Sequence, residues 1–189
     1  MKITVKVGIL FAFIWMMVKI SFLGMGKANE MLVPAVMTNI FLLLSSISVG
    51  LYLTKRKEID EESSALKDVK NGMTSGLIYA ILVSTFMYLY YAKIDTEFNR
   101  HQITESEMWF EKQIKDPKAL KEIRSSNEAF ETMTITELRK HYKKNIKANF
   151  SPLSTSTVGL LAMLLLGTLN SIFVTAVYRK IVFSKKALK

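Results

Sequence analysis

The sequence contains no cysteine, only two histidines and only three prolines among its 189 residues. The absence of cysteine excludes disulfides, thiolate metal sites and cysteine nucleophiles. Two of the prolines, Pro34 and Pro152, stand at the start of long apolar runs, so proline breaks none of these runs in its middle. The runs also lack Asp and Glu, which argues against a transporter coupled to protons or sodium, because such proteins place acidic residues or broken helices near the membrane midplane.

Catalytic motifs are missing as well. The sequence has no glycine-rich phosphate loop, no nucleophile elbow and no paired intramembrane carboxylates. His101 stands four residues before Glu105, and His141 is the second histidine, but this spacing is weak evidence for a metal site. We therefore expect no catalytic, cofactor-binding or metal-binding residues, and a protein that is not an enzyme.

Long hydrophobic runs are the main feature that the sequence does have. Half of its residues are hydrophobic, and a membrane span needs about 20 mostly apolar residues. Four segments qualify, at residues 3–24, 32–53, 73–92 and 152–178. Each is expected to be helical, because backbone amides must be paired in lipid and the runs lack the polar alternation of barrel strands. The predicted fold is all-α, an integral membrane four-helix bundle.

The distribution of charge predicts the orientation of these spans. The formal net charge is +10, and twelve cations face only five acids in the N-terminal segment, the loop at 54–72 and the tail at 179–189, which would share one side of the membrane. The positive-inside rule then predicts that both termini are cytoplasmic. The chain divides into spans one to three within 1–92, including a cytoplasmic loop at 54–72; a helical extracytoplasmic loop at 93–151; span four at 152–178; and a basic cytoplasmic tail at 179–189. The basic surplus thus needs no nucleic-acid partner.

The long loop carries helix-start signals. Residues 104–107 (TESE) and 134–137 (TITE) both match a capping box, which predicts helices near 105–115 and 135–149. Asp116 followed by Pro117 predicts the N-cap and first turn of a third, shorter helix that ends before residues 125–127.

The last of these helices is amphipathic. Its apolar residues recur at helical spacing, and its flank is basic. It could lie on the membrane surface, or its apolar stripe could pack on the other outer helices; the sequence leaves both open. If it lies on the membrane, three of its cations could contact lipid headgroups: Arg139, Lys143 and Lys147. Two cations of the basic tail, Arg179 and Lys180, could do the same on the other side of the membrane.

Small residues recur every fourth position in span three, at Gly72, Gly76, Ala80 and Ser84. Such residues let helix backbones approach closely in lipid. Span four has its own series at Gly167, Ser171 and Thr175. Counting about 1.5 Å per residue from each span centre places Ala80 level with Gly167, and Gly76 level with Ser171. We expect spans three and four to pack along these series; a homodimer through the same stripe is the competing interpretation.

Polar residues inside the other spans are few. Lys19 lies in the outer half of span one, and we expect its long side chain to extend to the outer interface. The alternative is that its ammonium donates to Asn39 on span two. The serines at 45–48 in span two suit hydrogen bonds between helices.

Several motifs carry a resemblance to a known family. They are residues 70–72 (KNG) before span three, 90–98 (YYAKIDTEF) at its end, and 151–161 (SPLSTSTVGLL) at the start of span four, followed by Gly167 and Ser171. With these the chain resembles domain of unknown function 4199, a family of short four-helix bacterial membrane proteins of the Bacteroidota. The family often has proline after the Asp of the second motif, where this chain has Thr96. The resemblance implies an inner-membrane location and supplies no chemistry.

Two functions agree with these features. One is a non-enzymatic scaffold or accessory subunit of the inner membrane, whose partners would be lipids and other membrane proteins. The alternative is a small carrier or lipid-handling membrane protein that acts as an oligomer. A polar cavity reaching the midplane would favour the alternative.

Overall fold

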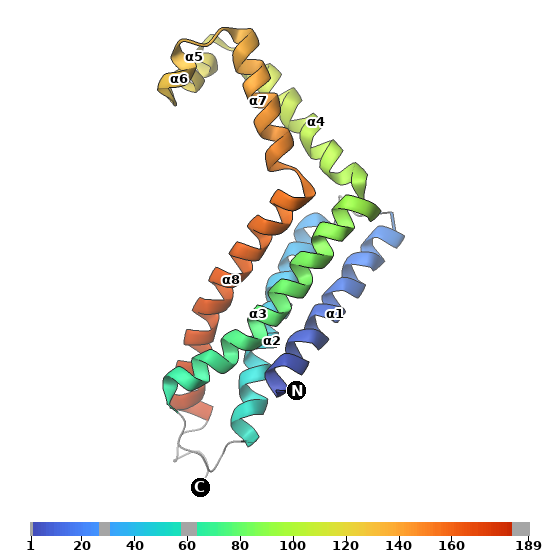
Figure 1. Ribbon diagram of the computed structural model, residues 1–189, viewed down its shortest axis with the longest axis vertical. Coiled ribbons are helices and arrows are strands. Elements are labelled where there is room, and N and C mark those ends of the chain that lie inside the picture. Colours follow the sequence, from blue (N-terminus) through green and yellow to red (C-terminus); the bar gives the residue numbers. More distant parts are fainter. Residues whose placement is uncertain (1, 27–30, 58–63, 183–189) are drawn as a thin grey trace. The chain divides into compact units, whose positions relative to one another are not determined.

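The computed structural model describes residues 2–26, 31–57 and 64–182 (Figure 1). The acidic residues predicted in the cytoplasmic loop (58–62) and the lysines of the predicted tail (185–189) lie outside the described residues. Every regular element of the described part is a helix, which confirms the all-α prediction. The elements are α1 (Ile3–Gly24), α2 (Leu32–Lys57), α3 (Ala65–Leu89), η1 (Tyr90–Ile94), α4 (Thr96–Gln113), α5 (Pro117–Ser125), α6 (Glu128–Glu131), α7 (Ile135–Asn149), α8 (Pro152–Val177) and η2 (Tyr178–Val182).

Four of the described helical segments are long and apolar enough to cross a membrane, as predicted. They are Ile3–Gly24, Leu32–Lys57, Ala65–Ile94 and Pro152–Ile181. The second and third extend into the predicted loop at 54–72, because α2 continues to Lys57 and α3 begins at Ala65. Lys, Arg, Ala and Leu are good helix formers, so a helix need not end where its apolar run ends.

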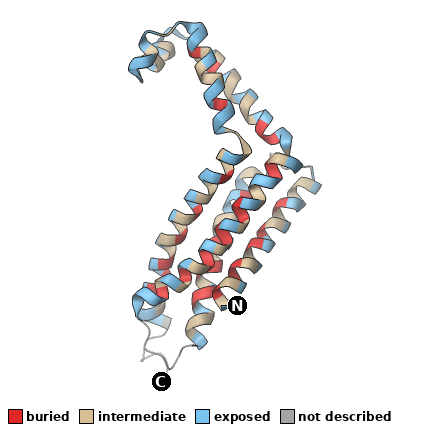
Figure 2. Ribbon diagram, in the orientation of Figure 1, coloured by how far each residue is buried: buried red, intermediate tan, exposed pale blue. Residues whose placement is uncertain are grey.

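The chain forms two compact units. Unit 1 contains residues 1–86 and 157–189, and unit 2 contains residues 87–156. In unit 1, buried residues form stripes along α1, α2 and α3, on the faces that these helices turn toward their neighbours (Figure 2). Leu43 and Ile47 of α2 and Tyr79 and Val83 of α3 are fully buried there.

Unit 2 has a small core of its own. Phe110 of α4, Ile114 directly after that helix and Leu138 of α7 are buried together. The rings of Phe110 and Tyr142 are stacked with their centroids 3.7 Å apart. Partly buried side chains of the segments between α4 and α7 complete the cluster: Leu120, Ile123, Phe130 and Met133.

Two of the three predicted helix starts in unit 2 are confirmed. The Asp116 carboxylate accepts from the Lys118 amide at the start of α5, with Pro117 in the first turn. Thr134 and Glu137 form a complete capping box at the start of α7. In α7 the Glu137 carboxylate accepts from the Thr134 amide and hydroxyl, both at 2.8 Å. These bonds hold the pKa of Glu137 below its usual value.

The third start, at Thr104, is wrong. Helix α4 already begins at Thr96, because the Asp95 side chain caps it by accepting from the Phe98 amide. Thr104 is therefore inside the helix, where its hydroxyl donates to the Arg100 carbonyl at 3.0 Å. A threonine can act as an N-cap only where its own backbone is outside the helix.

Candidate functional site

The small-residue series of α3 faces two helices. A Cβ at Gly72 would lie 3.3 Å from the Ser171 hydroxyl of α8, so these two residues do meet. A Cβ at Gly76 would instead lie 2.9 Å from the end of Ile47 on α2, and a Cβ at Gly167 would lie 3.5 Å from the same atom. Ile47 thus occupies the space that Gly76 and Gly167 leave open.

This arrangement corrects the predicted register. Ser171 was expected opposite Gly76 but lies against Gly72, about one helical turn earlier. The remaining members of the two series, Ala80, Ser84 and Thr175, are buried within the single chain. Among the described residues, the Ser84 and Thr175 hydroxyls have no hydrogen-bond partner, so these side chains contribute through their size.

Ser75 is a contact point of three helices that the sequence analysis missed. A Cβ at Gly8 of α1 would lie 2.7 Å from the Ser75 carbonyl oxygen, and a Cβ at Gly50 of α2 would lie 2.9 Å from the Ser75 hydroxyl. That hydroxyl donates to the Ser46 carbonyl at 2.9 Å. The four-residue spacing of Thr4, Gly8 and Ala12 is the same signal that marked α3, and it could have identified this face.

A second polar contact lies on the same face of α3, one turn further along. The fully buried Tyr79 donates its hydroxyl to the Asn39 side-chain oxygen at 2.6 Å. The Asn39 amide in turn faces the Met163 sulfur of α8 at 3.6 Å. Asn39 thereby connects α2 to both α3 and α8.

Lys19, which was predicted to extend to the outer interface, is buried within the chain. Its side chain is only 2% exposed, because it lies on the same face of α1 as the buried Ala12 and Trp15. The Asn39 oxygen that was considered as its alternative acceptor accepts a hydrogen bond from the Tyr79 hydroxyl.

Asp68 forms a buried ionic junction at one end of unit 1. Its carboxylate lies 2.9 Å from the Lys55 ammonium of α2 and 2.7 Å from the Arg179 guanidinium of η2, and its side chain is 1% exposed. We call this end, where α2 ends, α3 begins and η2 lies, the basic end. The sequence analysis assigned Asp68 to a loop, so this junction was not predicted.

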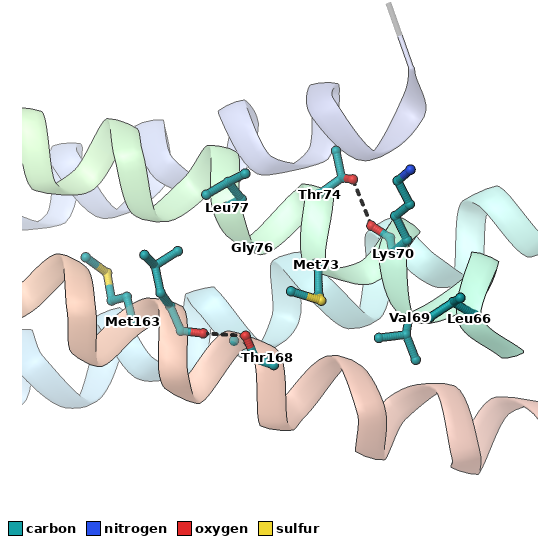
Figure 3. Close-up of a pocket in the computed structure, with 11 residues that line it drawn as sticks. Leu66, Val69, Lys70, Met73, Thr74, Gly76, Leu77, Met163 and Thr168 are labelled. Atoms are coloured by element: carbon teal, nitrogen blue, oxygen red, sulfur yellow. Dashed lines mark hydrogen bonds between the residues drawn. The ribbon is translucent and has the colours of Figure 1, made fainter.

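An apolar groove runs along unit 1 between α3 and α8 (Figure 3). Its volume is about 500 Å³. Val69 and Met73 of α3 and Met163 of α8 project into the space between the helices. The two hydroxyls on its lining, those of Thr74 and Thr168, donate to carbonyls of their own helices. The groove therefore offers apolar contact and little hydrogen bonding.

Of the five residues predicted to contact lipid headgroups, three form ion pairs with acidic side chains and two are exposed. In unit 2, Arg139 donates two hydrogen bonds to Glu111, at 2.6 and 3.0 Å, and Lys143 lies 3.4 Å from Glu107. The Arg139 guanidinium holds the pKa of the Glu111 carboxyl below its usual value. Lys147 is exposed. In unit 1, Arg179 pairs with Asp68 and Lys180 is exposed.

The apolar stripe of α7 packs within unit 2. Leu138 and Ile146 are buried, and Tyr142 stacks on Phe110 of α4. The structure thus shows the packing alternative for this face, while Ile135 at the first turn stays 43% exposed.

The histidines considered for a metal site are not part of a group of possible metal ligands among the described residues. The described residues contain no group of three or more His, Asp or Glu side chains arranged to hold an ion. His101 lies 3.5 Å from the Glu105 carboxylate, and both side chains are more than half exposed.

Comparisons with known proteins give one result. Searches of curated proteins and of solved structures each yield no match. The family model described as "Protein of unknown function (DUF4199)" matches residues 6–180. Because this match covers nearly the whole chain, the chain belongs to the DUF4199 family.

Proposed function

We propose that the protein is a multi-pass scaffold or accessory subunit of the bacterial inner membrane, without catalytic activity. The observation that supports this role is how the polar side chains of the four long helices are used. The Ser75 hydroxyl donates to Ser46, the Tyr79 hydroxyl donates to Asn39, and Asp68 pairs with two cations of unit 1. Polar groups that bond one another in this way rigidify a bundle.

The alternative, a small carrier, has less support. A carrier path requires polar groups that face a cavity near the membrane midplane. The groove between α3 and α8 is instead lined mainly by apolar side chains. Its geometry therefore supports the scaffold over a carrier for polar solutes.

The proposed orientation places the basic end and both termini in the cytoplasm and unit 2 in the periplasm. The described cations of this side lie at the helix ends, as the positive-inside rule requires. They are Lys2, Lys6, Lys55, Arg56, Lys57, Lys67, Lys70, Arg179 and Lys180.

Unit 2 offers a surface for protein contacts. Met108 and Trp109 of α4 are each 54% exposed, although the next residue, Phe110, is buried in the core. Methionine and aromatic residues are enriched at protein interfaces. A scaffold that meets its partners outside the membrane would use such residues.

Purification in a mild detergent, followed by identification of the proteins that remain bound, tests this role. We expect a defined partner to co-purify with the wild type and to be reduced when Trp109→Lys removes the exposed ring. Thr104→Lys introduces the same residue at an exposed position on another face of α4 and is the matched control. Purification of a lone chain at native expression level would overturn the scaffold proposal.

A further inference from the structure

We propose that the groove between α3 and α8 is a binding site for one acyl chain of an anionic phospholipid, whose headgroup lies beside Lys70. The proposal requires only that unit 1 spans a membrane; it goes beyond the scaffold role and does not depend on a protein partner. Its first support is the chemistry of the lining, which is apolar on both walls. Thr74 and Thr168 use their hydroxyls within their own helices, so neither hydroxyl requires a polar ligand in the groove.

Two glycines and Ile47 form the floor of the groove. Gly76 and Gly167 are both among its lining residues, one on each helix. Ile47 lies beneath both of them, so α2 closes the floor of the space. The side chains of Met73 and Met163 border it, and methionine adapts readily to an irregular apolar ligand.

The dimensions of the groove select a single extended chain. On α3 the lining runs from Leu66 to Leu77, which is about 16 Å along the helix axis and close to half of the roughly 30 Å of hydrocarbon in a bilayer. A helix segment of that length, about 10 Å wide, would occupy more than about 1,200 Å³. The groove, at about 500 Å³, cannot enclose a helix, and its length corresponds to one leaflet.

The charge at one end selects the headgroup. Among the described residues that line the groove, Lys70 is the charged one, and it is exposed near the basic end. In Figure 3 its side chain leaves α3 on the side away from α8, so the ammonium is outside the apolar interior, and rotation of the flexible stem would bring it to the edge of the groove. The nearby Asp68 does not offset this charge, because its buried carboxylate pairs with Lys55 and Arg179. An anionic headgroup at the membrane surface would therefore be attracted to this edge.

The test is reconstitution of the full-length protein into vesicles of phosphatidylethanolamine and phosphatidylglycerol. Extraction in mild detergent and native mass spectrometry then count the lipids that remain bound. We expect one phosphatidylglycerol per wild-type chain. Met73→Trp should fill the groove and abolish this retention. Ile81→Trp is the matched control, because Ile81 lies on the same helix, is similarly exposed (46% against 40% for Met73) and does not line the groove.

The headgroup is tested separately. Lys70→Gln should reduce the preference for phosphatidylglycerol over phosphatidylethanolamine about fivefold, whereas Lys6→Gln, an exposed lysine of α1 outside the groove, should leave it unchanged. Thr168→Phe fills the groove from α8 and should also abolish retention, which covers the case in which Met73→Trp fails to fold.

Three results would overturn the proposal. They are lipid retention by folded Met73→Trp or Thr168→Phe, equal retention of the two lipids by the wild type, and a chain dimer that both groove variants dissociate. The lipid count does not depend on whether a protein partner co-purifies. The experiment can therefore fail for the scaffold role and succeed for the lipid site, or the reverse.

Discussion

Gly8 and Gly76 face different kinds of atoms, and this difference determines the expected effect of substituting them. A Cβ at Gly8 would lie 2.7 Å from a backbone oxygen, that of Ser75. The backbones of α1 and α3 would have to separate, so we expect Gly8→Ala to lower the free energy of unfolding by about 1–3 kcal/mol. Thermal unfolding in detergent measures this loss.

Two other glycines serve as controls for that prediction. At Gly76 the nearest atom is the flexible end of Ile47, so Gly76→Ala should cost less than Gly8→Ala, although Gly76→Leu should disturb packing clearly. Gly159 of α8 has nothing within 4 Å of an added Cβ, and Gly159→Ala should be neutral or stabilising, since alanine favours the helix. Equal effects of all three alanine substitutions would contradict the packing assigned to Ser75.

Asp68 balances two cations at a buried position. Asp68→Asn keeps the shape of the side chain but removes its charge, which leaves Lys55, with a side chain 13% exposed, beside a second cation. We expect this variant to lose about 1–3 kcal/mol of stability. In the double variant with Lys55→Gln the loss should be smaller than the sum of the two single losses, because the two groups interact directly. Additive losses in thermal or denaturant unfolding would argue against the junction.

At the scale of the helix, Thr104 and Thr134 give a matched pair. Both stand three residues before a glutamate, but only Thr134 caps a helix. Thr134→Ala should therefore destabilise the start of α7 by about 1 kcal/mol, while Thr104→Ala in the middle of α4 should be close to neutral. Hydrogen exchange of the first-turn amides of α7 is the measurement. Faster exchange there in both variants, or in neither, would show that the cap has been assigned to the wrong residue.

The Glu111–Arg139 pair joins α4 to α7 and should make unit 2 sensitive to acid. The pKa of Glu111 lies below its usual 4.5 because Arg139 donates to the carboxylate. A group whose pKa is lower in the folded state stabilises the fold above its ordinary pKa, and this contribution is lost as the pH falls through the folded value. Glu111→Gln should thus melt below the wild type at neutral pH, and the difference should fade in acid below pH 4.5.

The expected effect of Glu111→Gln is small, because the two side chains are 34% and 40% exposed. Glu97→Gln is the control, since Glu97 pairs with Arg100 within one helix and both are more than 70% exposed. A difference between Glu111→Gln and the wild type that persists unchanged in acid would assign the effect to packing and exclude the ion pair.

Local chemistry explains which elements of unit 2 could be predicted. The starts at Asp116 and Thr134 depend on residues within three positions of one another, so the sequence alone specifies them. The T-x-x-E pattern at Thr104 has the same letters, but Asp95 had already started the helix. A pattern of four residues cannot report that a helix began eight residues earlier.

At the scale of the whole molecule, the four spans were predictable and their contacts only in part. Hydropathy identifies the spans because lipid demands long apolar helices. The register between α3 and α8 was wrong by one turn, because counting along two helices ignores Ile47 of a third helix that separates Gly76 from Gly167. The burial of Lys19 could have been found, since positions 8, 12, 15 and 19 share one face of α1.

The orientation of the whole chain can be tested through its lack of cysteine, because any introduced thiol is then the only one. Arg56 at the end of α2 and Lys118 in α5 are both exposed. With both termini in the cytoplasm, α3 carries the chain across the membrane between these positions, so Lys118→Cys should react with a membrane-impermeant maleimide on intact cells. Arg56→Cys should react only after the inner membrane is opened. The reverse pattern would invert the topology, and labelling of both from the same side would mean that α3 does not cross the membrane.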